Sequence, residues 1–163
     1  MARKVFYSFY YDEDNWRASK IRNIGVIDGN QPAKDNDWEI VNKGGDPAIE
    51  RWIKGQMEGR TCSIVLIGAN TAGRKWINYE IVESWKRGMG LLGIYIHRIT
   101  DRNEVQSAQG ANPFSGFNIN GKALDGIVKA YNPQHYSSKD TYNYIAENLE
   151  GWITEAIRIR NAY

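Results

Sequence analysis

The chain has 163 residues, which is the length of one ordinary domain, because compact domains are most often about 100–150 residues long. We therefore expect a single domain over residues 1–163. Hydrophobic residues make up 42% of the chain and charged residues 25%, a balance that excludes intrinsic disorder and low-complexity sequence. The net charge is only +2 and the two signs are interspersed, which disfavours binding to nucleic acid.

The chain contains one cysteine, Cys62, and two histidines, His97 and His135. A lone cysteine cannot form an internal disulfide, and these residues are too few for a zinc site, so we expect no metal and a reducing compartment. No apolar run approaches the about 20 residues that span a bilayer, and the amino-terminal segment has no apolar signal core. We therefore expect a cytoplasmic protein without a membrane partner.

Short apolar runs and helical patterns alternate from the first residues onward. Residues 5–9 are β-prone and predict a strand, and the polar cluster at residues 12–15 predicts the start of a helix. A second apolar run at residues 24–27 predicts another strand, which a long surface loop containing Pro32 and Trp38 follows.

The next segment predicts a helix that ends at Gly59. Asp46 can cap its start, and Pro47 fits the first turn of a helix. Its apolar residues share one helical face, namely Ile49, Trp52, Ile53 and Met57.

The middle of the chain carries the strongest hydrophobic signal. Residues 62–68 form its most hydrophobic run, which is too short for a helix and predicts a central strand covered on both faces. A glycine-rich turn at residues 68–73 follows, and residues 91–96 predict another buried strand. Between them, apolar residues recur at helical spacing up to Gly88, namely Ile77, Ile81, Val82 and Trp85.

The last third of the chain is less regular until its final helix. Glycines and prolines interrupt residues 98–138, where only residues 126–131 indicate an edge strand. Asp140 can cap a terminal helix that carries an apolar stripe from Ile145 to Ile157. Alternating strands and helices predict parallel βαβ units, and hence a small α/β sandwich.

Ligands of open parallel sheets bind at the carboxyl edge, where the loops that follow the strands meet. Three segments converge there in the predicted fold, which are residues 9–12, the loop near Asp37 and Trp38, and residues 68–76. Six aromatic residues lie near these segments and could stack on a flat ring, although we expect most of them to be packing residues. They are Tyr7, Tyr10, Tyr11, Trp38, Trp76 and Tyr79.

Glu80 is the candidate acid for this edge. On a helical wheel it lies about 60° from Ile77, on the shoulder of the buried face, and side chains tilt toward the helix amino terminus. This geometry can aim the carboxylate into a cleft. The alternative is a glutamate that only benefits from the helix dipole or pairs with Lys86 or Arg87, and spacing alone favours that alternative.

Arg74 and Lys75 place two cations near a helix amino terminus, which the helix dipole disfavours. Arg74 and the backbone amides near Gly73 could hold a phosphate or pyrophosphate, and the equally supported alternative is that both side chains extend into water. The glycines match neither the dinucleotide nor the P-loop fingerprint.

Two other kinds of site receive less support. Asp12 and Asp14 could cap the first helix or bind Mg²⁺ as in a phosphoacceptor domain. A receiver domain needs an acceptor aspartate after its central strand, and no acid lies there before Glu80. His97 and His135 lack the nucleophile elbow that a catalytic triad would need.

The sequence resembles the TIR-like family typified by the TIR protein of the bacterial Thoeris antiphage system. The resemblance covers the chain up to about residue 115 and is most specific in the segment Trp76-x-x-x-Glu80. The other matching segments are Val5-Phe6-Tyr7-Ser8-Phe9-Tyr10-Tyr11 with Asp14, Arg17 and Ile21-Arg22-Asn23, then Ser63-Ile64-Val65-Leu66-Ile67-Gly68, Arg74-Lys75-Trp76-Ile77-Asn78-Tyr79-Glu80-Ile81 and Asn112-Pro113-Phe114.

The resemblance implies a flavodoxin-like, three-layer α/β sandwich with a mostly parallel five-stranded sheet. It also implies that NAD⁺ is the substrate, with no other cofactor, and that the product is nicotinamide with a cyclic ADP-ribose isomer that activates a separate effector protein. Glu80 matches the family's catalytic glutamate, and Ser8, Phe9 and Tyr10 match the loop after the first strand that borders the nicotinamide ribose in the family. We also expect Tyr11, Arg74 and Trp76 to bind the substrate. The alternative is a non-catalytic TIR module that assembles with other TIR surfaces.

Overall fold

The computed structural model describes residues 3–25, 27–29 and 44–163. Its central sheet has five strands in the order β2-β1-β3-β4-β7, and every neighbouring pair is parallel. This is the 2-1-3-4-5 order of flavodoxin-like sheets. The predicted parallel α/β architecture is therefore confirmed. The strands are β1 (Arg3–Ser8), β2 (Ile27–Gly29), β3 (Cys62–Ile67), β4 (Gly90–Tyr95) and β7 (Lys129–Tyr131).

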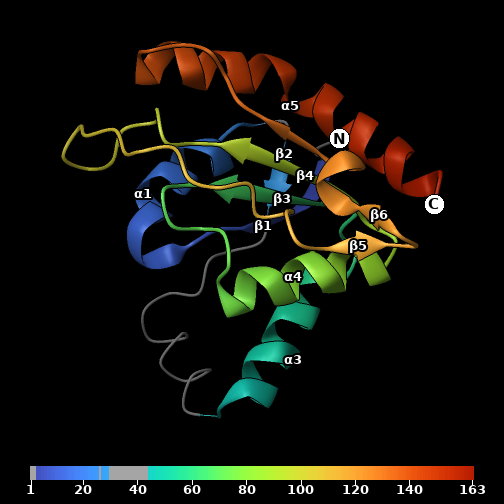
Figure 1. Cartoon of the computed structure of the whole chain (residues 1–163). Coiled ribbons are helices and arrows are strands. Elements are labelled where there is room, and N and C mark those ends of the chain that lie inside the picture. The colour runs from blue at the N-terminus through green and yellow to red at the C-terminus, as the bar shows by residue number, and fades with distance from the viewer. Residues whose placement is uncertain (1–2, 26, 30–43) are drawn as a thin grey trace.

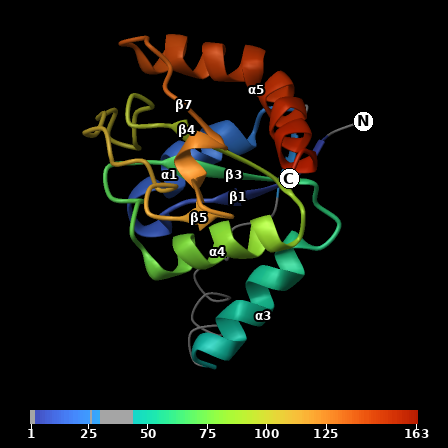
Figure 2. The same ribbon diagram turned by 45° about the vertical axis from the view of Figure 1, so that its right-hand side comes forward.

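Four α-helices of the described chain cover the two faces of this sheet (Figure 1). They are α1 (Tyr11–Arg22), α3 (Asp46–Met57), α4 (Lys75–Lys86) and α5 (Ser138–Asn161). Helices α1 and α5 share one hydrophobic cluster with the sheet, whereas α3 and α4 pack against the opposite face, as the rotated view also shows (Figure 2). The molecule thus has three layers. No helix of the described residues is both long and apolar enough to cross a bilayer.

Strands β3 and β4 form the centre of the core. All six residues of each strand are buried, as expected for central strands of a parallel sheet with helices on both faces. Side chains alternate between the faces, so Ile64 and Leu66 contact the cluster under α1 and α5, while Val65 and Ile67 contact the cluster under α4. This accounts for the continuous hydrophobic runs in the sequence.

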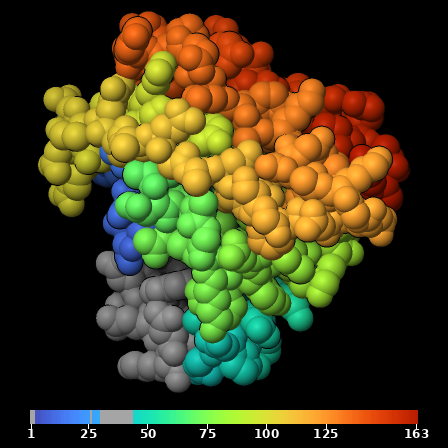
Figure 3. Space-filling view, in the orientation of Figure 1, coloured from blue at the N-terminus to red at the C-terminus, as the bar shows by residue number. Residues whose placement is uncertain are grey.

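The segment between β4 and α5 forms a band across one side of the molecule, between α5 and α4 (Figure 3). It contains a short antiparallel pair, β5 (Asn118–Ile119) and β6 (Lys122–Ala123), and a 3₁₀ turn at Leu124–Gly126. The edge strand predicted within residues 126–131 is confirmed for β7, but it begins only after the 3₁₀ turn.

Two predicted element starts are wrong. Strand β2 begins at Ile27 and not at Ile24, because a turn that follows α1 bonds Ile24 N to Ile21 O and Ile27 N to Ile24 O, both at 3.1 Å. Helix α3 is capped by Gly45, and Asp46 is its first helical residue and pairs with Lys75. The predicted loop with Pro32, Asp37 and Trp38 lies outside the described residues.

The cap of α5 also differs from the prediction. Ser137 occupies the cap position, and its side-chain oxygen accepts a hydrogen bond from Asp140 N at 3.0 Å. Asp140 lies in the first turn, where its negative charge is stabilised by the positive end of the helix dipole. The sequence contained the cap signal, three residues before the predicted one.

We expect Ser137→Ala to lower the free energy of unfolding by about 0.5–2 kcal/mol, since it removes a partner from a helix-terminal amide. Asp140→Ala removes only the dipole interaction, so we expect a loss of about 0.3–1 kcal/mol. Urea unfolding of both variants measures the difference. A larger loss for Asp140→Ala would show that the cap assignment is wrong.

Candidate active site

A cavity of about 290 Å³ opens at the carboxyl edge of the sheet, at the end of β1. The chain leaves β1 toward β2 on one side and returns to β3 on the other, so strand order reverses between β1 and β3. Such a reversal leaves a crevice in which open parallel sheets bind ligands. The described residues that line the cavity are Phe6, Tyr7, Phe9, Tyr10, Tyr11, Asp12, Trp52, Ile53, Arg74, Lys75, Trp76, Ile77 and Glu80.

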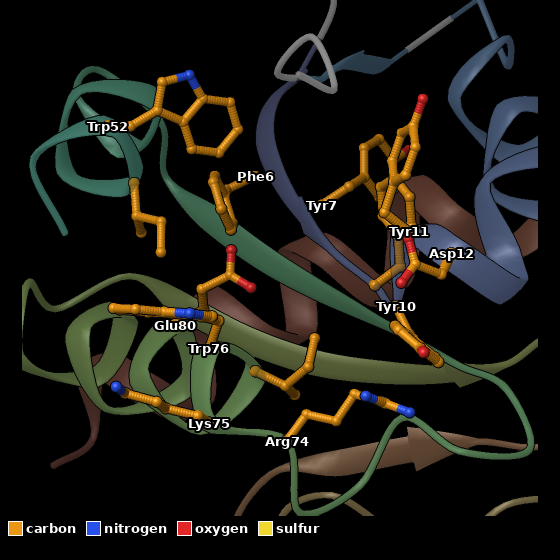
Figure 4. A pocket seen from close by; sticks show the side chains of 13 residues that line it. Phe6, Tyr7, Tyr10, Tyr11, Asp12, Trp52, Arg74, Lys75, Trp76 and Glu80 are labelled. Atoms are coloured by element: carbon orange, nitrogen blue, oxygen red, sulfur yellow. The ribbon is translucent and has the colours of Figure 1, made fainter. Parts of the chain in front are cut away.

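Glu80 lies in the second turn of α4, and its carboxylate faces this cavity (Figure 4). Burial raises the pKa of the Glu80 carboxyl group to about 8, and the hydrogen bond from Ser8 opposes that rise. Within the described residues Glu80 has no ion pair, and Arg87 instead contacts Glu83 at 3.1 Å. The geometry therefore excludes the alternative in which Glu80 pairs with Arg87.

Hydrogen bonds to two strands hold this part of α4 in place. The Ser8 hydroxyl, at the end of β1, donates to Glu80 Oε1 at 2.9 Å. Ser84 Oγ donates to the backbone oxygen of Glu80 at 2.6 Å, and the Ser63 hydroxyl on β3 lies 2.6 Å from the Ser84 hydroxyl. Glu80 is thus fixed through its side chain by β1 and through its backbone by β3.

Aromatic rings enclose the cavity around Glu80. Phe6 is 1% exposed and reaches it from β1, Trp76 lies one turn before Glu80, and Trp52 reaches it from α3 (Figure 4). Tyr79 packs edge-on against Trp76, with ring centroids 5.6 Å apart, and does not line the cavity. The result is a largely apolar space with a carboxylate in its wall.

Sequence reasoning placed Trp52 in the packing face of its helix and did not assign it to the site. The sequence pattern of this helix was ambiguous, because Trp52 and Ile53 belong to one apolar stripe and that stripe packs against Phe6. Only the position of α3 beside β1 and α4 shows that this end of the stripe borders a cavity.

The two cations at the start of α4 both contact protein groups. The Arg74 guanidinium lies over the ring of Tyr10, 3.2 Å from its centroid, and Arg74 Nε donates to Asn70 O at 2.8 Å. Lys75 forms an ion pair with Asp46 and lies 5.0 Å from the Trp76 ring centroid. Both side chains line the cavity, and that of Lys75 is also 65% exposed to water.

The loop after β1 brings most of its predicted residues to the cavity. Phe9, Tyr10 and Tyr11 line it, and the rings of Phe9 and Tyr11 stack with centroids 6.3 Å apart. Ser8 is 2% exposed and is not among the lining residues, so its predicted contact with the substrate has no geometric support.

The candidate residues for other chemistry lie elsewhere or have structural partners. His97 is buried and His135 is exposed, and neither lines the cavity. Asp12 lines it, but neither Asp12 nor Asp14 caps α1, because Tyr10 is the cap residue. Among the described residues, no three His, Cys, Asp or Glu side chains form a group that could hold a metal ion.

A buried ion pair on α1 contacts the loops that follow β3 and β4. Arg17 Nη1 lies 3.1 Å from Asp14 Oδ1, and both side chains are at most 6% exposed. Arg17 also donates to Ile99 O at 2.7 Å and to Val105 O at 2.8 Å, which fixes the loop after β4. A Cβ on Gly68 would lie 2.1 Å from Asp14 Oδ2, so this close approach requires glycine.

The fold and the site define a flavodoxin-like α/β protein with an aromatic-lined cavity that holds a glutamate, at the point where the strand order reverses. Residues 6–101 match the family described as "Thoeris protein ThsB, TIR-like domain". The chain therefore belongs to this TIR-like family. The matched region contains residues 6–8 of β1, the Trp76-x-x-x-Glu80 segment and all the described residues that line the cavity.

The chain is also similar to a protein of Bacillus cereus (strain MSX-D12) named "Putative cyclic ADP-D-ribose synthase ThsB1". The two are 36% identical over 119 residues, which is 70% of this chain and 62% of that protein. The alignment thus spans less than two thirds of the relative's length.

Proposed function

We propose that the protein cleaves the bond between nicotinamide and ribose in NAD⁺ and forms a cyclic ADP-ribose isomer. The observation that carries this proposal is the Glu80 carboxylate, which faces an aromatic cavity at the carboxyl edge of the sheet. Membership of the TIR-like family and the name of the relative from Bacillus cereus support the same reaction.

The cavity supplies what this reaction requires. Nicotinamide in NAD⁺ is a cationic leaving group, and when the C–N bond breaks, its electron pair neutralises the ring and leaves a positive centre on the ribose. A nearby carboxylate stabilises that centre, and a water-poor site strengthens the attraction. Glu80 can provide the charge and can also accept a hydrogen bond from a ribose hydroxyl.

Size and charge favour one orientation of the substrate. A volume of about 290 Å³ is at the lower end for small-molecule sites, so it suits the nicotinamide half of NAD⁺ rather than the whole dinucleotide. We place the nicotinamide and its ribose beside Glu80 and Trp76, with Phe9, Tyr10 and Tyr11 along the ribose side. Arg74 then faces the diphosphate, and it would exchange its contact with Tyr10 for a phosphate oxygen.

The cyclic product depends on excluding water. If an adenosine or ribose oxygen of the same molecule attacks the ribose centre and loses its proton, a ring forms, whereas attack by water gives ADP-ribose. The aromatic walls from β1, α3 and α4 favour the first outcome because they leave little polar surface to hold a water molecule. The cyclic product would then act on a separate effector protein in antiphage defence.

Incubation of the purified protein with NAD⁺ tests the proposal, with chromatography to separate nicotinamide, ADP-ribose and a cyclic isomer. We expect nicotinamide and the cyclic isomer in equal amounts. Glu83→Gln is a matched control that changes an acid on the same helix without touching the cavity, and we expect it to retain turnover. No nicotinamide from the concentrated wild-type protein would overturn the enzymatic proposal and favour a non-catalytic assembly module.

A further inference from the structure

Ser8 is almost completely buried, at 2% exposed, yet it touches the one acid on which the proposed reaction depends. It is the last residue of β1, and its hydroxyl donates to Glu80 Oε1 at 2.9 Å. Ser8 is not among the described residues that line the cavity. The side chain therefore reaches the site only through Glu80.

The alternation of side chains along β1 explains the position of Ser8. Phe6 and Ser8 are two residues apart, so their side chains project from the same face of the sheet. The phenylalanine ring is long enough to form part of the cavity wall, whereas the short serine side chain ends against the glutamate. A serine at this position thus lies behind the carboxylate rather than beside a bound ligand.

We propose that Ser8 is a positioning residue that favours the ionised form of the Glu80 carboxyl group and aims it into the cavity, without itself touching NAD⁺. This inference rests on the proposed function, because it concerns the group that we assign to the reaction. It also replaces the contact between Ser8 and the substrate that the family resemblance implies.

The hydroxyl hydrogen stabilises the charged carboxylate more than the neutral acid. Burial is the larger influence and raises the pKa of Glu80, and the Ser8 hydrogen bond lowers it. Without that bond, a larger share of Glu80 would be protonated near neutral pH, and a neutral acid stabilises a developing positive charge poorly.

Other ionisable groups face the same cavity but are arranged differently. Arg74 and Lys75 at the start of α4 contact Tyr10 and Asp46, and Asp12 of α1 also lines the space. The phenols of this cavity come from Tyr7, Tyr10 and Tyr11, and α3 contributes Trp52 and Ile53, which carry no charge. Among the described residues, Ser8 makes the one hydrogen bond to the Glu80 carboxylate.

Ser8→Ala, measured from about pH 6 to about pH 9.5, tests the inference. Hydrogen bonds to charged groups correspond to about one pKa unit or more, so we expect kcat/KM near pH 7 to fall about tenfold. The difference in kcat/KM between Ser8→Ala and the wild-type protein should narrow at high pH, where Glu80 ionises even without the hydrogen bond from Ser8. KM for NAD⁺ should change little. Ser8→Cys retains a weaker hydrogen-bond donor, so its kcat/KM near pH 7 should lie between those of the wild-type protein and Ser8→Ala.

Ser63→Ala is the matched control. Ser63 is also buried, at 1% exposed, lies beside Phe6 in the register of β3 with β1, and bonds Ser84 rather than a carboxylate. Because Ser63 supports only the backbone of Glu80, through Ser84, we expect any loss of kcat/KM to be equal at every pH and the midpoint of the pH profile to stay in place. An equal loss for Ser8→Ala at every pH would reduce Ser8 to a structural role, and a raised KM with an unshifted profile would make it a substrate ligand; either result overturns the inference.

A second measurement does not require turnover. Carbon-13 NMR of glutamate-labelled protein, with the Glu80 signal assigned by Glu80→Gln, reports the ionisation of this carboxyl group directly. Ser8→Ala should move its midpoint to higher pH, and an unmoved midpoint overturns the inference. Should the wild-type protein not cleave NAD⁺, the proposed function would fail, and the NMR titration would still decide the relation between Ser8 and Glu80.

Discussion

We expect Glu80→Gln to lower the release of nicotinamide from NAD⁺ by about 10²- to 10⁴-fold. Glutamine has almost the same shape as glutamate, and its amide oxygen can still accept the hydrogen bond from Ser8. The variant therefore removes the negative charge and leaves the cavity walls in place. Chromatography of nicotinamide under single-turnover conditions measures the loss in the chemical step.

The same variant should be more stable than the wild-type protein at alkaline pH. Glu80 has an ordinary pKa of 4.5 and a folded pKa of about 8, so between these values the folded state holds a proton that the unfolded state releases. The free energy of unfolding contributed by Glu80 therefore falls as the pH rises from about 4.5 to about 8. Glutamine does not titrate, and we expect the advantage of the variant to grow across this window.

A protein that loses activity and gains stability cannot have lost activity by unfolding. Glu83→Gln again provides the comparison, because Glu83 pairs with Arg87 on the same helix and does not face the cavity. We expect that variant to retain activity and to show no such rise in stability between about pH 5 and about pH 8. Wild-type rates of nicotinamide release by Glu80→Gln would remove Glu80 from the mechanism.

The position of Glu80 could be predicted because helical geometry is local. Its angle from Ile77 and the tilt of side chains toward the helix amino terminus depend on α4 alone, and the central strand before it was the clearest hydrophobic signal in the chain. The helical wheel could not show whether the Glu80 carboxylate faces a cavity or the solvent. That distinction needs β1 and α3, which lie beside α4 only in the folded chain.

The features that sequence reasoning missed are the hydrogen bond from Ser8 to Glu80 and the place of Trp52 in the cavity wall, and both depend on such long-range contacts. Ser8 and Glu80 are 72 positions apart, and no local pattern relates a serine at a strand end to an acid on a later helix. Trp52 belongs to the apolar face of α3, and such a face is an ordinary packing pattern. That Trp52 also lines the cavity becomes apparent only in the folded chain. The band between β4 and α5 has few helical or strand signals, because its short strands pair with each other or with the sheet edge.

Arg17→Met should lower the free energy of unfolding by about 3–5 kcal/mol, because removing one partner of a buried ion pair leaves the other charge uncompensated. Methionine retains much of the apolar stem but cannot donate to Asp14 or to the carbonyls of Ile99 and Val105. We also expect faster hydrogen exchange at the Ser107 amide, which bonds His97 O within the loop that Arg17 fixes. Urea unfolding and exchange rates measure the two effects.

The loss should depend on pH in a way that identifies Asp14 as its source. Burial already raises the pKa of Asp14, and Arg17 opposes that rise, so removing Arg17 raises the folded pKa further. An acid whose folded pKa lies above its unfolded value loses stability as the pH rises, so the deficit of Arg17→Met should shrink toward acid pH, where Asp14 is protonated in both states. A deficit independent of pH would assign the loss to the two loop carbonyls alone.

Arg158→Met is the matched control for burial. Arg158 also forms an i,i+3 pair on a helix, with Glu155 at 2.6 Å, but its side chain is 68% exposed, so we expect a much smaller loss of stability than for Arg17→Met. The double variant Asp14→Leu with Arg17→Met removes both buried charges and should recover part of the stability lost by Arg17→Met. If the double variant were less stable than Arg17→Met, the uncompensated carboxylate would not be the cause of the loss.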